Sequence, residues 1–178
     1  MKGLNKAVKI VAKILEVAHW VAACLMVAVA ICSVTASQWL GYFIDMNAIE
    51  NGGEISVYGF EVAVVNMKTL LLFAIGSVVI YALVAMIFRN IYLIIKKAES
   101  STPFNKDNIR MVREIGIFSI AIPIIGFIMS IVIRLAVGVD AAEISVNFDG
   151  FVMGIIVLCL TQFFSHGAEL EKDVDGLL

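Results

Sequence analysis

The sequence predicts an all-α membrane protein, a bundle of four transmembrane helices with a small extracytoplasmic cap that resembles a β-hairpin. The first reason is composition: hydrophobic residues make up 61% of the 178 residues and charged residues only 16%. Soluble domains contain roughly 45–50% apolar and about 25% charged residues. The second reason is that the hydrophobic residues gather in four long runs. A bilayer accepts such runs, whereas a soluble protein needs a polar surface around them.

The four apolar runs are long enough to be membrane spans. A helix needs about 20 residues to cross roughly 30 Å of hydrocarbon. The first three runs meet this length, and the fourth, Phe151–Phe164, is extended toward the headgroups by Ser165–Ala168. We therefore expect one domain, 1–178, with spans at about 14–38, 64–95, 109–138 and 150–168, outer loops at 39–63 and 139–149, an inner loop at 96–108 and a tail at 169–178.

The basic residues predict the orientation. Eleven of the thirteen Lys and Arg residues fall on one side of the spans: Lys2, Lys6, Lys9, Lys13, Arg89, Lys96, Lys97, Lys106, Arg110, Arg113 and Lys172. Because Lys and Arg are enriched in cytoplasmic loops, we expect a multi-pass cell-membrane protein with both termini in the cytoplasm. Val34-Thr35-Ala36 has the small-residue pattern of a signal-peptide cleavage site, but Glu16 and His19 interrupt the signal core. We therefore expect the first helix to be retained.

Both outer loops contain the sequence Glu-Ile-Ser-Val, at 54–57 and at 143–146. Its alternation of apolar and polar residues is typical of a half-buried strand. We expect the segments at about 54–59 and 143–148 to be extended and to pair with each other. Ile55, Val57, Ile144 and Val146 would then cover the outer mouth of the bundle.

The inner loop and the tail carry the two most distinctive motifs. The loop contains Thr102-Pro103-Phe104-Asn105, in which either Thr102 or Asn105 could cap the next helix. Together with Asn108, Arg110, Ile115 and Gly116, this motif resembles the Pro-Phe loop of the bacterial membrane protein family called domain of unknown function 2975. The tail 164–171, followed by Asp173 and Asp175, is similar to the closing motif of that family, although Gly176-Leu177-Leu178 departs from the family's threonine and aliphatic ending.

The resemblance implies no established reaction. Family members look like partners of small helix-turn-helix regulators encoded beside them, which implies a non-enzymatic signalling or regulatory protein with a small cytoplasmic DNA-binding partner. The residues expected to dock a partner, or to hold loop and tail together, are Pro103, Phe104, Asn105, Arg110, Arg113, Gly167, Glu169, Leu170 and Asp173. Pairing of the basic loop with the acidic tail explains the same charges equally well.

Several function classes lack their sequence signals. The net charge of −2 gives no basic excess for phosphate neutralisation, so we expect no direct nucleic-acid binding. The chain has no phosphate-binding glycine loop, His-Glu-x-x-His motif, nucleophile elbow or paired CxxC, so we expect neither an enzyme nor a cofactor. The alternative function is a transporter or a lipid- or small-molecule-binding bundle, which predicts a polar cavity at mid-membrane depth. Gly150 and Gly154 allow close helix packing, either within the chain or in a homo-oligomer.

Charged residues within membrane spans are costly and are therefore candidate sites. Arg134 lies near the outer end of the third span, where it could reach headgroups, pair with Glu61 or Asp140, or form an anion or lipid-headgroup site. A second candidate group has Glu and His three residues apart on two spans: Glu16, His19, His166 and Glu169. These side chains could converge on a metal, but the full ligand set of helix-bundle metal sites is absent. We therefore favour interfacial residues that face water and predict no metal.

Overall fold

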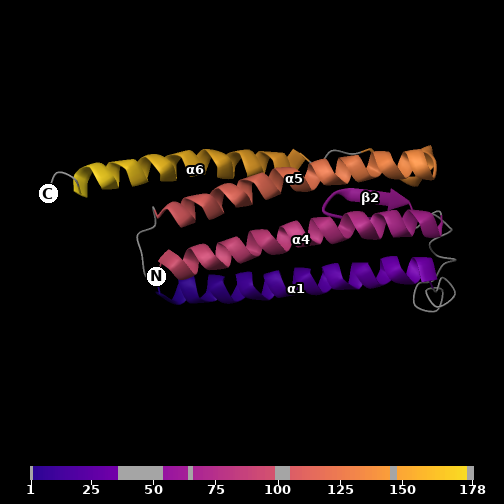
Figure 1. Ribbon diagram of the computed structural model, residues 1–178, viewed down its shortest axis with the longest axis horizontal. Coiled ribbons are helices and arrows are strands. Elements are labelled where there is room, and N and C mark those ends of the chain that lie inside the picture. Colours follow the sequence, from indigo (N-terminus) through magenta and orange to yellow (C-terminus); the bar gives the residue numbers. More distant parts are fainter. Residues whose placement is uncertain (1, 36–53, 64–65, 99–104, 145–147, 176–178) are drawn as a thin grey trace. The chain divides into compact units, whose positions relative to one another are not determined.

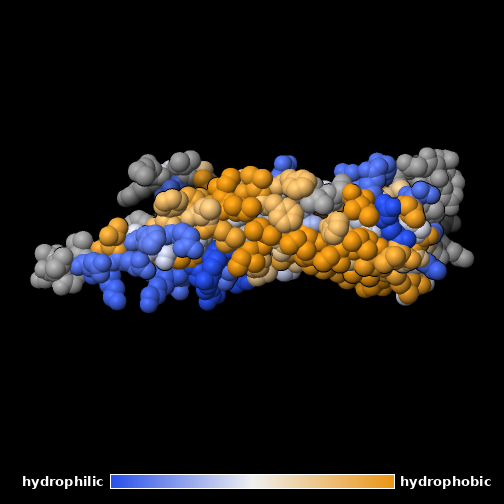
Figure 2. Space-filling model, turned by 90° about the horizontal axis from the view of Figure 1, so that it is seen from above, coloured by the Kyte–Doolittle hydropathy of each residue, from blue (hydrophilic) through white to orange (hydrophobic). Residues whose placement is uncertain are grey.

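The computed structural model describes residues 2–35, 54–63, 66–98, 105–144 and 148–175. It contains four helices that are long and apolar enough to cross a membrane: α1 (Lys2–Thr35), α4 (Met67–Ala98), α5 (Lys106–Ala136) and α6 (Phe148–Asp175) (Figure 1). Together with a small hairpin, these helices confirm the predicted fold class of a four-helix membrane protein. Figure 2 shows hydrophobic side chains over the middle stretches of the helices and hydrophilic side chains near helix ends.

The chain divides into two compact units, and α1, α4 and α5 each contribute residues to both. The first, here called the basic unit, comprises 1–18, 84–120 and 149–178 and contains the Lys- and Arg-rich ends of α4 and α5. The second, here called the hairpin unit, comprises 19–83 and 121–148 and contains the only two strands among the described residues.

Asparagine side chains cap two of the helices. The Oδ1 atom of Asn66 accepts hydrogen bonds from the backbone N–H and the hydroxyl group of Thr69, at 3.0 and 3.1 Å. The Oδ1 atom of Asn105 accepts one from the backbone N–H of Asp107 at 3.1 Å. These oxygens satisfy donors that the first helical turn leaves without partners. The prediction that Asn105 caps a helix is confirmed, whereas Thr102 lies outside the described residues.

Strand β1 (Glu54–Val57) pairs with β2 (Phe60–Ala63) in an antiparallel hairpin, with Val57 opposite Phe60. Of the segment predicted to be extended, 54–59, residues 54–57 form a strand, whereas Tyr58 and Gly59 form the turn. Its predicted pairing with 143–148 is wrong for the described residues of that segment. Glu143 and Ile144 belong to no strand, and residues 145–147 lie outside the described residues. The described part of the second outer loop contacts the hairpin through an isolated bridge from Ala142 to Val62 and through the packing of Ala141 and Ala142. A partner two residues along the chain costs much less loop-closure entropy than one some 80 residues away.

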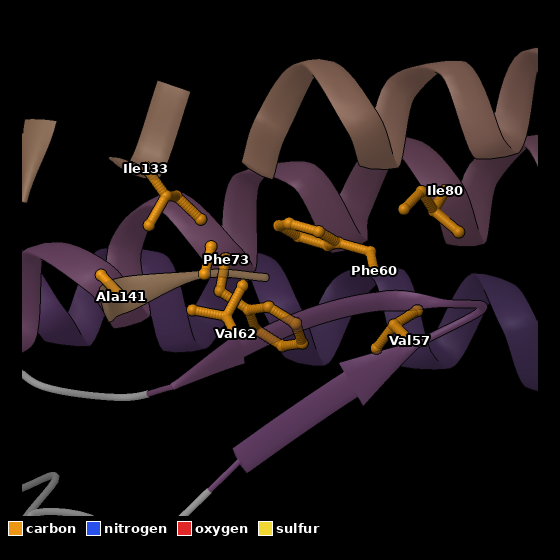
Figure 3. Close-up of a cluster of buried hydrophobic side chains, with 8 residues drawn as sticks. Val57, Phe60, Val62, Phe73, Ile80, Ile133 and Ala141 are labelled. Carbon is orange, nitrogen blue, oxygen red and sulfur yellow. The ribbon is translucent and has the colours of Figure 1, made fainter. Parts of the chain in front are cut away.

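One face of the hairpin forms the core of the hairpin unit. Val57, Phe60 and Val62 are buried and pack with side chains of α4 and α5 (Figure 3). The Phe60 ring stacks on the Phe73 ring with centroids 5.1 Å apart. Glycines make room for Phe60, since a Cβ atom on Gly76 would lie 2.9 Å from its ring and one on Gly126 would lie 3.3 Å from its Cβ atom. The hairpin therefore fits a slot lined by glycine on two helices.

The tip of the hairpin, at Tyr58, contacts residues within the apolar runs of α1 and α4. Tyr58 contacts His19 of α1 and Tyr81 of α4, with ring centroids 6.0 and 6.3 Å away. Tyr81 lies eleven residues beyond Leu70, where the apolar run of α4 begins, which corresponds to about 16 Å along a helix. That is about half of the roughly 30 Å hydrocarbon thickness. The hairpin thus packs alongside the apolar run of α4 and does not lie over its end, because its apolar face needs helix side chains to bury against.

In the basic unit, α5 and α6 cross at a pair of glycines. A Cβ atom on Gly154 would lie 2.8 Å from the carbonyl oxygen of Gly116, and one on Gly116 would lie 3.1 Å from that of Gly154. The glycine signal noted in the sequence therefore serves packing within the chain at Gly154. Such close approach brings the two backbones into van der Waals contact, which drives helix association in lipid.

Candidate functional site

The ends of α4 and α5 in the basic unit enclose a cleft of about 600 Å³. Each helix contributes three charged or polar residues, and the rest of the wall is apolar. The lining residues are Met86, Arg89, Asn90, Leu93, Lys97, Asp107, Arg110, Met111, Glu114 and Phe118. Both walls of the cleft are helical: α4 continues past its apolar run to Ala98, and α5 begins directly after its cap, Asn105.

Glu114 forms hydrogen bonds to residues of both helices that line this cleft. Its Oε2 atom accepts a hydrogen bond from the side-chain amide of Asn90 at 3.1 Å, and its Oε1 atom accepts one from the Nε atom of Arg110 at 3.0 Å. Asn90 is buried and Glu114 is partly buried. Because both carboxylate oxygens are engaged, Glu114 fixes Arg110 against α4 and joins the two helices through a polar contact.

A second ion pair, between Lys97 and Asp107, also lines the cleft. The Nζ atom of Lys97 lies 2.6 Å from the Oδ2 atom of Asp107. Both side chains are well exposed, so the pair contributes little to stability. Its consequence is geometric, since it brings the end of α4 to the first turn of α5.

The far end of α6 carries the acidic residues of the tail. His166 and Glu169 pair through Nδ1 and Oε2 at 3.3 Å, and both side chains are more than two-thirds exposed. Leu170 is 66% exposed, Asp173 is exposed, and Gly167 is half-buried on the same helix. Arg110 pairs with Glu114 and Lys97 pairs with Asp107, so both cations have a carboxylate partner on α5.

The four residues considered for a metal find other partners. Glu16 is buried and pairs with Lys13 at 2.9 Å, and the Nζ atom of Lys13 lies 5.5 Å from the centre of the Tyr92 ring on α4. His19 contacts the hairpin tip, with its Nε2 atom 2.5 Å from the Tyr58 hydroxyl oxygen. Among the described residues, no group of three or more His, Cys, Asp or Glu side chains lies close enough to hold a metal ion. His19 therefore does not face water as expected but contacts a tyrosine pair.

Arg134, in the hairpin unit, forms a hydrogen bond to a backbone carbonyl group of the loop that follows α5. Its Nη1 atom donates a hydrogen bond to the carbonyl oxygen of Ala142 at 3.4 Å, and the side chain is half-buried. The described residues show no ion pair between Arg134 and Glu61 or Asp140, the two partners expected from the sequence. The contact ties α5 to the loop that follows it, close to the bridge between Ala142 and Val62.

The remaining docking residues are placed as follows. Pro103 and Phe104 lie outside the described residues, Asn105 caps α5, and Arg113 is exposed on α5 one turn from Arg110. The sequence reasoning missed Arg89, Asn90 and Glu114 as parts of one site. Asn90 could have been recognised from the sequence, because an amide on an otherwise apolar helix needs a hydrogen-bond partner. Glu114 was a candidate partner, since it is the last charged residue before the next apolar run.

Comparisons with known proteins add no identity to this description. A scan of family models, a search of curated proteins and a search of solved structures each found no match to the chain.

Proposed function

We propose that the chain is a non-enzymatic membrane signalling or regulatory protein that presents the end of α6 to a soluble cytoplasmic partner. The observation that supports this proposal most directly is the continuation of α6 beyond its apolar run. Residues 165–175 extend the helix by about 16 Å past Phe164. The bias of Lys and Arg to one side of the spans supports a cytoplasmic location for this end.

The surface of the α6 end suits a basic partner. Glu169, Glu171 and Asp173 fall within five residues, with Lys172 as the one basic residue of this stretch apart from His166. The exposed Leu170 adds an apolar contact beside these acids. A rim of charge around an apolar anchor is the usual composition of a protein interface and raises the association rate with a partner of opposite charge.

A small DNA-binding regulator is the partner class that fits best. Such a protein carries a basic surface, because it must neutralise phosphates. That surface is complementary to the acidic helix end, and the resemblance to the domain of unknown function 2975 family implies the same kind of partner. Binding at the membrane would then compete with binding to DNA, which is a direct way to regulate.

Affinity purification from the native membrane tests this proposal. The wild-type chain is compared with a Glu169→Gln, Glu171→Gln, Asp173→Asn triple variant and with a chain that ends at Leu170. We expect a small basic protein to co-purify with the wild type, to rebind when purified, and to be reduced about tenfold or more in both variants, since the three charges together contribute roughly 1.4 kcal/mol.

The matched control removes three exposed carboxylates from the hairpin unit, by Glu54→Gln, Asp140→Asn and Glu143→Gln. This control should recover the partner as well as the wild type does. If no soluble protein is recovered, and purified chain in liposomes moves a solute, the transporter alternative replaces the signalling proposal.

A further inference from the structure

The cleft between α4 and α5 is amphipathic. Its cations are Arg89, Lys97 and Arg110, and its apolar wall consists of Met86, Leu93, Met111 and Phe118. A soluble anion needs only the cations. A membrane lipid needs both kinds of lining, because its charged headgroup and its acyl chains meet within a few ångströms. Basic pockets between transmembrane helices bind anionic headgroups for this reason.

The cleft also lies at the level where headgroups are found. Arg89 is the first charged residue after the apolar run Leu70–Phe88, and Glu114 is the last charged residue before the apolar run that begins at Ile115. Both belong to the cleft lining. The boundary between apolar and charged residues along a span marks the membrane interface. The cleft is therefore at the interface on two helices at once.

The charges of the lining leave one cation in excess, since three cations face two carboxylates, Asp107 and Glu114. Lys97 and Arg110 are paired with these carboxylates. Arg89 is exposed and, among the residues that the structure describes, takes part in no ion pair. Arg110 contacts Glu114 through Nε, which leaves its two Nη groups for a second acceptor. A guanidinium fork of five N–H donors matches the geometry of a phosphate.

We propose that this cleft binds the phosphate of an anionic phospholipid. Arg89 is the principal phosphate ligand, Arg110 is the second, and Glu114 positions Arg110 through the bond to its Nε atom. The acyl chains lie along Met86 and Phe118, which are on the apolar side of Arg89 and Glu114. This site does not depend on the function proposed for the α6 end, which involves none of these residues.

Native mass spectrometry of the purified full chain tests the site. The chain is reconstituted in nanodiscs that contain phosphatidylglycerol and phosphatidylcholine in equal amounts, then stripped of lipid stepwise. We expect the wild type to retain phosphatidylglycerol in preference to phosphatidylcholine. Arg89→Gln should lower this retention about fivefold, and Arg89→Gln with Arg110→Gln should lower it by more than about tenfold, because each cation near an anionic headgroup contributes a factor of roughly five.

Arg113→Gln is the matched control. Arg113 is an exposed arginine on α5, the helix of Arg110, but its side chain does not line the cleft. The variant should retain lipid within about twofold of the wild type. Circular dichroism establishes that each variant keeps its helices, and Arg89→Gln breaks no ion pair of the described residues, so its loss reports binding. Unchanged retention in the folded Arg89→Gln variant, or an equal loss in Arg113→Gln, overturns the site.

Two further arms separate the source of the phosphate. Inorganic phosphate and glycerol 3-phosphate, added at millimolar concentration, carry the same anionic group without acyl chains. We expect neither to displace the bound phosphatidylglycerol. Displacement by either one would assign the cleft to a soluble phosphate compound and overturn the assignment to a lipid.

Discussion

The hairpin unit and the basic unit are built from the same helices but are held together differently. In the hairpin unit, apolar side chains interlock, and Phe60 fills a slot between Gly76 and Gly126. In the basic unit, α4 and α5 meet through polar contacts around Glu114 and leave a cleft between them. Around Phe60 the interlocked side chains leave no room for a ligand, whereas the polar contacts of the basic unit border a polar cleft. The apolar pocket of the hairpin unit lies elsewhere, between α1 and α4. We therefore expect the hairpin core to contribute mainly to stability and the polar cleft to bind a ligand.

The largest test of this difference is Phe60→Ala. Phe60 is 1% exposed, and its removal opens a cavity against two glycines that cannot fill it. We expect a loss of about 3–5 kcal/mol in the free energy of unfolding. Reversible unfolding in mixed micelles measures this loss, with Phe163→Ala as the control. Phe163 is 73% exposed on α6, so its variant should stay within about 0.5 kcal/mol of the wild type. Equal losses in the two variants would show that the slot does not stabilise the protein.

A second test concerns the close approach of Gly154 and Gly116 in the basic unit. In a Gly154→Ala variant the new Cβ atom would lie 2.8 Å from the carbonyl oxygen of Gly116, which is backbone and cannot rotate away. We expect a loss of about 1–3 kcal/mol in the free energy of unfolding, as for other overpacked sites. Gly3→Ala is the control, because a Cβ atom there meets nothing within 4 Å. A Gly154→Ala variant as stable as Gly3→Ala would mean that α5 and α6 separate easily.

The smallest change in the free energy of unfolding is expected for Glu114→Gln. This substitution tests the polar contacts of the basic unit alone, because it removes a charge but changes the side-chain volume very little. The glutamine keeps an acceptor oxygen for Asn90 but weakens the contact with Arg110. Because the Glu114 side chain is 30% exposed, we expect a loss of only about 0.5–1 kcal/mol in the free energy of unfolding.

The same Glu114→Gln variant should retain more phosphatidylglycerol than the wild type, since the cation excess of the cleft rises from one to two. Glu169→Gln, which changes the same charge on α6 away from the cleft, is the control and should change neither quantity. A fall in lipid retention for Glu114→Gln would contradict this expectation and indicate that the positioning of Arg110 by Glu114 outweighs the gain in net positive charge.

The long helices and one strand could be predicted because their signals are local. Apolar runs, the Asn105 cap and the alternation at 54–57 each depend on residues close together in the chain. The pairing of the strand could not be predicted from the repeated Glu-Ile-Ser-Val sequence, because repetition does not specify contact. The actual partner follows a two-residue turn, Tyr58-Gly59, in which only the glycine is a typical turn residue.

The sites were harder to predict for a related reason. Arg110 was among the predicted docking residues, but its neighbours Arg89, Asn90 and Glu114 were not grouped with it. Their grouping depends on which faces of α4 and α5 meet, and two apolar helices offer many similar faces. Likewise, nothing in the sequence places His19 beside Tyr58, 39 residues away. Polar residues at the ends of apolar runs identify candidates, and only tertiary packing identifies their partners.

The turn of the hairpin has a consequence for the order of folding. Tyr58 has a φ of 52°, a left-handed conformation that costs an ordinary L-residue about 1–2 kcal/mol. An isolated two-stranded hairpin is marginal even with a favourable turn. We therefore expect the segment 54–63 not to fold on its own, because its strands need the surface that α1, α4 and α5 form around Phe60 and Tyr58. The hairpin should close after the helices assemble, and pulsed hydrogen exchange during refolding would then show its amide hydrogens protected last.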